Sequence, residues 1–133
     1  MKTNPKIGVT HEQTFVVEAH HLVDFAGEGM PAVLCTPALV GFLERTARLA
    51  LLPVLEPGEN SVGTDIEISH LAPTPAGQTV TCRARTVHAE GPKVTFHLEA
   101  RDEQELIARG MHTRRVIREE RFAQAVRRKA ASR

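Results

Sequence analysis

The chain has 133 residues, which predicts one domain of the commonest size, and a formal net charge of only +1 at pH 7. This balance, with no Trp, no Tyr and five Phe, excludes a global attraction to polyanions and disfavours base stacking, so nucleic acid is not expected as a partner. Two cysteines without C-x-x-C spacing, no apolar leader and no run of membrane-spanning length predict a cytoplasmic protein with free thiols and no membrane partner.

The first half of the chain predicts an extended segment, a loop and one long helix. Side chains alternate through residues 7–23, and residues 26–31 are rich in turn formers. A helix should begin at Thr36 and Pro37, because a Thr hydroxyl can accept from an early helix N–H, and Pro lacks an N–H that has no partner there. The helix should run to about Leu55, before a Pro-Gly breaker. Its broad apolar stripe leaves little polar arc and predicts extensive burial.

Four runs with a period of two follow this helix and predict strands that each have one covered face. The runs are residues 62–71, 79–88, 93–100 and 106–117, and arginines and a histidine interrupt the alternation of the last one. In the first run the even-numbered side chains from Val62 to His70 should share a face. Residues 119–129 predict a short C-terminal helix with Phe122 and Val126 on one side.

This order of elements predicts an α+β domain with the hot-dog architecture, in which a curved antiparallel sheet wraps one long helix. The short connections between the later strands favour a meander. Such a sheet leaves an edge open, and open edges commonly pair with a second copy of the same chain. The sequence therefore predicts a single domain over residues 1–133 that forms a homodimer.

Three side chains in this region, Thr36, Glu44 and His70, have types that can act in catalysis. Each also has a structural explanation: Thr36 caps the helix, Glu44 pairs with Arg48 one turn later, and His70 is a satisfied core residue. The functional alternative is a single cleft. There Glu44 acts as general base or nucleophile, His70 transfers a proton, and the helix start stabilises an oxyanion. The helix and the following strand must pack together, so the three residues can converge.

Several motifs occur at fixed positions around these residues. They are the eight-residue step from Thr36 to Glu44, LEPGE at 55–59, VGT at 62–64, His70, TP at 74–75, and Gly110-x-His112-x-Arg114-x-Val116. Together they resemble the fluoroacetyl-CoA thioesterase family of hot-dog proteins over residues 33–122. The resemblance implies hydrolysis of an acyl-CoA thioester, with coenzyme A as part of the substrate and no separate cofactor. It implies that Thr36, Glu44 and His70 are catalytic and that Gly63 lies beside the thioester carbonyl.

The segment before the helix departs from this resemblance. The family's fluoroacetyl-CoA enzyme has a longer lid here, with several aromatic residues. In this chain Phe25 is the only aromatic residue within 20–34, and Gly27, Gly29 and Met30 occupy the gate region. The departure leaves the hydrolytic residues in place and predicts an acyl group other than fluoroacetyl.

Two other functions remain open from the residues alone. A hot-dog hydratase uses an Asp and a His five residues apart, as Asp65 and His70 are, but in a regular strand these two side chains point to opposite faces. A non-catalytic protein that binds acyl-CoA or another small ligand would keep the fold and the cleft without turnover.

The remaining charged and metal-binding side chains suggest no further site. The cationic tail, with Arg127, Arg128, Lys129 and Arg133, is expected to be a solvated helix end. Some of these cations, or Arg83, Arg85 and Arg114, are candidates to meet the phosphates of coenzyme A. No metal is predicted, because the seven His show neither H-x-x-x-H nor H-x-x-E-H spacing.

Overall fold

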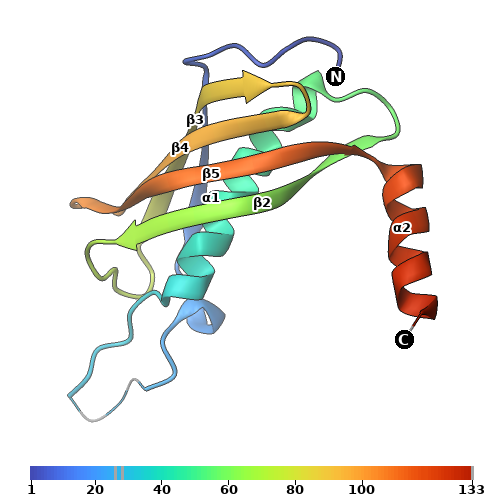
Figure 1. The fold of residues 1–133 in the computed structure, drawn as a ribbon. Coiled ribbons are helices and arrows are strands. Elements are labelled where there is room, and N and C mark those ends of the chain that lie inside the picture. The colour runs from blue at the N-terminus through green and yellow to red at the C-terminus, as the bar shows by residue number, and fades with distance from the viewer. Residues whose placement is uncertain (26, 28, 133) are drawn as a thin grey trace.

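The computed structural model describes residues 1–25, 27 and 29–132 of the chain. In chain order the elements are β1 (Thr10–Val16), the 3₁₀ helix η1 (Ala19–His21), α1 (Thr36–Leu51), the 3₁₀ helix η2 (Leu52–Val54), β2 (Glu59–His70), β3 (Thr79–Glu90), β4 (Lys93–Arg101), β5 (Leu106–Arg118) and α2 (Glu119–Ala131). The sheet curves around α1, and α2 stands away from the body (Figure 1). This is the α+β hot-dog arrangement that the sequence predicts.

The described strands form one antiparallel sheet in the order β1-β3-β4-β5-β2. Strands β3, β4 and β5 form the predicted meander, but β2 pairs with β5 instead of β3. The expectation of a meander through all four later strands is therefore wrong. Residues 71–78 connect β2 to β3 and contain Pro73 and Pro75. This connection is too long for a tight hairpin, and it leads from β2 past the ends of β5 and β4 to β3. Strands β1 and β2 are left as the two edges.

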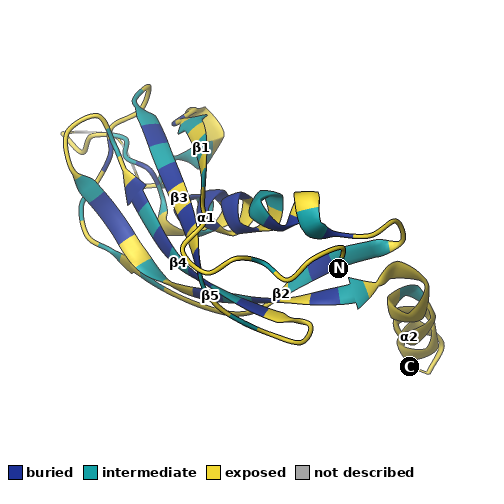
Figure 2. Cartoon of the chain, turned by 90° about the horizontal axis from the view of Figure 1, so that it is seen from above, coloured by how far each residue is buried: buried dark blue, intermediate teal, exposed yellow. Residues whose placement is uncertain are grey.

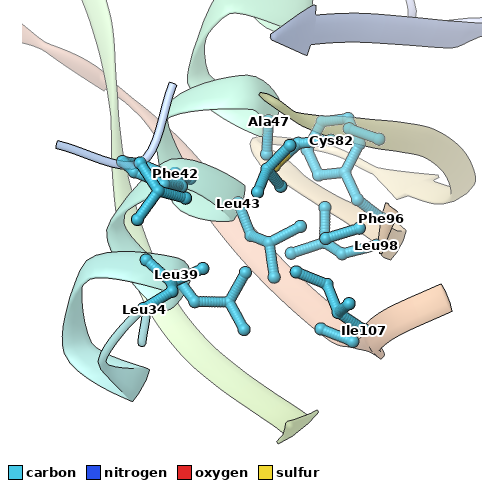
Figure 3. Close-up of a cluster of buried hydrophobic side chains, with 14 of the residues drawn as sticks. Leu34, Leu39, Phe42, Leu43, Ala47, Cys82, Phe96, Leu98 and Ile107 are labelled. Carbon is cyan, nitrogen blue, oxygen red and sulfur yellow. The ribbon is translucent and has the colours of Figure 1, made fainter. Parts of the chain in front are cut away.

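The core lies between α1 and the concave face of the sheet (Figures 2 and 3). Apolar residues at helical spacing bury one side of α1, each contributing roughly 1.5–3 kcal/mol for a large aliphatic or aromatic side chain. The buried residues of α1 are Leu39, Phe42, Leu43, Thr46, Ala47 and Leu51. The opposite side, with Pro37, Gly41, Glu44, Arg45 and Arg48, is exposed. The predicted extensive burial thus holds for one side of the helix, because no other element among the described residues covers the opposite side.

The ends of α1 differ slightly from the prediction. The helix begins at Thr36 as expected, but Cys35 occupies the N-cap position and no side chain caps the helix. The prediction that Thr36 is the cap is wrong, because its hydroxyl bonds to His70 instead. The α-helix ends at Leu51, and η2 continues the turn up to Val54, before the predicted end at Leu55.

The segment before α1 is less regular than predicted. Strand β1 occupies only residues Thr10–Val16 of the predicted extended run, and η1 follows it. In the predicted loop at 26–31, Ala26 and Glu28 lie outside the described residues. Gly27 and Met30 exchange two backbone hydrogen bonds. Gly29, which lies between them, has a positive φ that favours glycine.

Strand β2 contains a bulge that changes which side chains face α1. Gly63 pairs with Arg114 and Asp65 pairs with Thr113, so Thr64 is the extra residue in this ladder. Gly63 faces α1 before the bulge, and His70 faces it after the bulge. The predicted even-numbered face from Val62 to His70 is therefore correct only beyond Thr64. The bulge places Gly63 and His70 on the same face of the sheet.

The C-terminal part agrees with the predicted elements and adds one correction. His112 and Arg114, which were expected to interrupt the alternation of β5, lie on its inner face and are buried. None of residues 119–131, all of which the structure describes, is buried in α2, and Phe122 and Val126 are exposed. Arg133 of the cationic tail lies outside the described residues. In the described part of the chain, no helix is both long and apolar enough to cross a membrane.

Candidate active site

Thr36 and His70 form the first of two pairs between α1 and β2. Thr36 is the first residue of α1, His70 is the last residue of β2, and a hydrogen bond of 2.8 Å joins Thr36 Oγ1 to His70 Nδ1. The pair lines a hollow of about 330 Å³ together with residues of the preceding loop, such as Val23 and Val33. His70 Nε2 is buried and has no hydrogen-bond partner among the described residues. A buried nitrogen without a hydrogen bond is unfavourable, so His70 Nε2 is suited to bind a polar group from outside the described chain.

Glu44 and Gly63 form the second pair, two helical turns further along α1. A Cβ atom on Gly63 would lie 2.6 Å from Glu44 Oε2 and 3.0 Å from His112 Cε1, so any side chain at this position would displace the carboxylate. The Glu44 side chain is 49% exposed, whereas that of Arg114, which donates from Nη1 to Oε2 over 3.4 Å, is 4% exposed. The predicted partner, Arg48, is wrong. The carboxylate instead lies against a buried cation.

A buried polar network lies beneath Gly63. Arg114 donates from Nε to Ser61 Oγ and from Nη2 to Ser61 O, each over 2.9 Å. Its Nη1 also lies 3.3 Å from His112 Nε2, and His112 Nδ1 lies 2.8 Å from Asp65 O. These bonds bind Arg114 within the protein, so it is not free to meet the phosphates of coenzyme A. The sequence contained this network as the His112-x-Arg114 motif, but no local signal linked it to Glu44.

Burial governs the charge states in this network. Burial is the largest cause that lowers the pKa of His112 below its ordinary value, and the hydrogen bond to Asp65 O opposes it only in part. Burial also lowers the pKa of Arg114, against the attraction of Glu44, but a guanidinium stays protonated in proteins. The network therefore holds a neutral imidazole beside a buried cation.

Within one chain the predicted residues form two separate pairs and not one cluster. Thr36 and Glu44 are eight residues apart on α1, which is about 12 Å along the helix axis. Their partners, His70 and Gly63, share the face of β2 that is turned toward α1. Both pairs thus lie along the same side of α1, beside the edge strand of the sheet.

Asp65 does not join His70 in a hydratase-like pair. The strand is regular from Asp65 to His70, with its only register shift before Asp65, so the two side chains point to opposite faces as predicted. Asp65 takes part in the network only through its backbone carbonyl.

A separate group of metal-ligand side chains lies around η1. One ligand atom each from Glu18, His20 and His21 comes within 4.8 Å of the others. Neither H-x-x-x-H nor H-x-x-E-H spacing includes this group, because its two histidines are adjacent on a 3₁₀ turn. Glu18 N–H donates to His21 Nδ1 over 3.0 Å, which engages one of the two imidazole nitrogens. None of Thr36, Glu44 and His70 belongs to this group.

Comparison with known proteins gives concordant matches over nearly the whole chain. The model of a family described as fluoroacetyl-CoA-specific thioesterase matches residues 17–120. The fluoroacetyl-CoA thioesterase of Streptantibioticus cattleyicolor is 38% identical over 97% of this chain and 97% of its own length. A solved structure of the fluoroacetyl-CoA thioesterase FlK superposes with a TM-score of 0.86 at 37% identity, covering 93% of this chain and 96% of that one.

More distant structures share the same fold. A Thermus thermophilus member of the thioesterase superfamily superposes with a TM-score of 0.87 at 29% identity, covering 96% of this chain and 94% of that one. A hot-dog-like protein from Thermanaerovibrio acidaminovorans, at 24% identity and a TM-score of 0.86, covers 96% of this chain and 94% of its own and supports the fold alone. With the family match and the close relative, these superpositions lead to one assignment: the chain belongs to the fluoroacetyl-CoA-specific thioesterase family and is a thioester hydrolase with the hot-dog fold.

Proposed function

We propose that this protein hydrolyses a small acyl-CoA thioester with Thr36, Glu44 and His70, and that the thioester carbonyl lies beside Gly63. The observation that carries the proposal is the placement of both pairs on one side of α1, facing one side of β2. Coenzyme A enters as part of the substrate, and the proposed chemistry needs no separate cofactor.

The relatives support a small acyl group. The curated relative is a fluoroacetyl-CoA thioesterase, and a structure of a FlK mutant in complex with acetyl-CoA superposes on 93% of this chain with a TM-score of 0.86. The gate region supports an acyl group other than fluoroacetyl, because Phe25 and Met30 are exposed and Phe25 is not among the residues that line the hollow at His70.

The proposed roles follow from what each atom can reach. Arg114 holds Glu44 Oε2, and no hydrogen bond from the described residues reaches Oε1. This oxygen can attack the carbonyl and displace the thiolate of coenzyme A, with water then hydrolysing the mixed anhydride, or it can take a proton from the water that attacks the thioester. The bond from Thr36 to His70 Nδ1 orients the imidazole, so that Nε2 can meet the substrate or the attacking water. In a single turnover in heavy-oxygen water, an acid product without heavy oxygen would identify Glu44 as the nucleophile, because only a mixed anhydride that water opens at the Glu44 carbon transfers a Glu44 oxygen to the product.

We also propose that the active protein is a homodimer with β2 at its interface. Strand β2 is an edge strand, and its residues 63–67, including the apolar Ile66, are exposed. Gly63 and His70 share a face, so antiparallel pairing of β2 with a second copy near Glu67 sets Gly63 beside His70 of the partner subunit. Each complete site would then combine the Glu44 pair of one chain with the Thr36 pair of the other.

A reducing, cytoplasmic location fits the cysteines. Cys35 and Cys82 are both free thiols. Cys82 is buried, and burial raises its pKa to about 12, which keeps this thiol protonated and unreactive. We expect a thiol reagent to leave Cys82 unmodified until the protein unfolds. Rapid modification of both cysteines in the folded protein would contradict its burial.

The test of function is turnover of a panel of acyl-CoA thioesters, followed by the ultraviolet absorbance of the thioester bond. Glu44→Gln and His70→Ala should each abolish most of the activity. The controls Glu56→Gln and His88→Ala change the same residue types at exposed positions outside the site and should match the wild type. Binding of acyl-CoA without turnover would favour the non-catalytic alternative. Full activity in Glu44→Gln would reject the proposed site.

A further inference from the structure

The polar network beneath Gly63 is unusual because its central side chains are almost fully buried. His112 is 2% exposed, Arg114 is 3% exposed and Ser61 is 5% exposed. Burial of a charged or polar group is unfavourable unless its hydrogen bonds are satisfied. If these positions on β5 served stability alone, apolar residues would fill them at least as well. We therefore look for the function of the network at its exposed end, which is Glu44.

The hydrogen bonds determine the protonation of His112. A guanidinium has only donors, so Arg114 Nη1 donates to His112 Nε2, and Nε2 must be the acceptor nitrogen. The proton of the neutral imidazole is then on Nδ1, which donates to the carbonyl oxygen of Asp65. That carbonyl directly follows the bulge residue Thr64, so the irregularity of β2 supplies the acceptor that selects this tautomer.

The same bonds fix the direction of Arg114. Ser61 accepts hydrogen bonds from Nε and Nη2, and His112 accepts one from Nη1. These bonds along two edges of the guanidinium fix its orientation. Nη1 is thereby directed at Glu44 Oε2, over Gly63. One carboxylate oxygen is held from below while the other stays open, which is the geometry required of a base or nucleophile that must keep its position.

We propose that His112 is a positioning residue of this thioesterase: its neutral imidazole, with the proton on Nδ1, aims Arg114 at Glu44 and so keeps the carboxylate in place for hydrolysis. The inference rests on the proposed role of Glu44. His112 itself does not touch the substrate and acts only through Arg114.

Protonation of His112 should disable this arrangement. A protonated imidazole has no acceptor nitrogen, so the contact with Arg114 Nη1 would change from a hydrogen bond into repulsion between two cations. The charged groups that face His112 are Arg114 on β5 and Glu44 on α1, and its neighbour on β4 is the apolar Phe96. The carboxylate of Asp65 on β2 lies on the other face of the sheet and acts on His112 only through a weaker, longer-range attraction. Because the pKa of His112 is lowered, activity should persist below pH 6.5 and decline as the pH falls through that lowered value.

Two amide variants separate the two hydrogen bonds of His112. His112→Gln places an acceptor near the position of Nε2 and can still hold Arg114, whereas His112→Asn mimics only Nδ1 and can still reach Asp65 O. We expect His112→Gln to keep kcat within about threefold of the wild type and to extend activity to lower pH. We expect His112→Asn to lower kcat by about 10- to 100-fold, with KM nearly unchanged.

The control is Thr46→Val, which removes a buried hydroxyl that donates to Phe42 O on α1, away from Glu44. It should lower Tm without changing kcat, and it separates loss of stability from loss of position. The proposal is overturned if His112→Asn keeps the wild-type kcat, if His112→Gln loses as much as His112→Asn, or if the acidic limb is the same in His112→Gln and the wild type. A wild type without turnover would instead reject the proposed function, because the His112 variants are compared only for an active enzyme.

Discussion

Gly63 shows how a missing side chain can make room for a carboxylate. It lies where β2 approaches α1, and the space that a Cβ atom would occupy is taken by the carboxylate of Glu44 and the ring of His112. A glycine in the interior of a strand usually weakens it, so its presence here fits the close approach of Glu44 to the strand. The sequence predicted Gly63 through family resemblance, but the contact with His112 and Arg114 depends on strands far apart in the chain.

Substitution of Gly63 by alanine should separate activity from stability. The added Cβ would come within 2.6 Å of Glu44 Oε2, which is the far end of a flexible side chain and can move away. The fold should therefore survive with a small change in Tm, while kcat/KM falls by about 10- to 100-fold because the carboxylate is displaced. Steady-state kinetics and thermal melting of the same preparation check both parts. A large loss of Tm with unchanged kinetics would contradict this reading of the site.

The buried His112 should also make stability depend on pH. The folded state lowers the pKa of this imidazole below its ordinary value of 6.5, so the unfolded chain binds the proton more readily. Stability from this group is present above pH 6.5 and decreases as the pH falls toward the lowered pKa. The free energy of unfolding, measured by denaturant titration across this range, should fall with pH in the wild type and fall less in His112→Gln. If the free energy of unfolding changed equally with pH in both proteins, the lowered pKa of His112 would be contradicted.

At the scale of elements, the sequence predicted what local periodicity controls. The position of α1, the later strands and α2 follow from apolar spacing and breakers such as Pro57-Gly58, and these agree within a few residues. The bulge at Thr64 could not be predicted, because it arises from the register between β2 and β5 and has no local signature. For the same reason the pairing of Glu44 with Arg114 replaced the locally plausible pairing with Arg48.

The open side of α1 gives a test at this scale. Gly41 is exposed in the middle of the helix, and no heavy atom lies within 4 Å of the position of an added Cβ. Gly41→Ala should raise the free energy of unfolding by about 0.5–1 kcal/mol, because alanine loses less backbone entropy in a helix. Chemical denaturation of the two proteins measures the difference. A loss of stability would show that something covers this position in solution.

At the scale of the whole molecule, the sequence predicted the hot-dog fold and the candidate residues but not how they combine. The two pairs, Thr36 with His70 and Glu44 with Gly63, are about 12 Å apart along one helix, and a single chain does not close this distance. If two copies of β2 pair along their exposed edges, the Thr36–His70 pair of one chain lies beside the Glu44–Gly63 pair of the other, across a two-fold axis. We therefore propose that each complete site takes residues from two chains.

Complementation between two inactive variants tests this claim most directly. Glu44→Gln and His70→Ala chains are co-expressed with different affinity tags, and the mixed dimer is purified through both tags. If the sites are shared between chains, one site of the mixed dimer contains both changes and the other contains neither. We expect the mixed dimer to recover about half of the wild-type activity per dimer. A mixed dimer as inactive as its two parents would contradict the shared site.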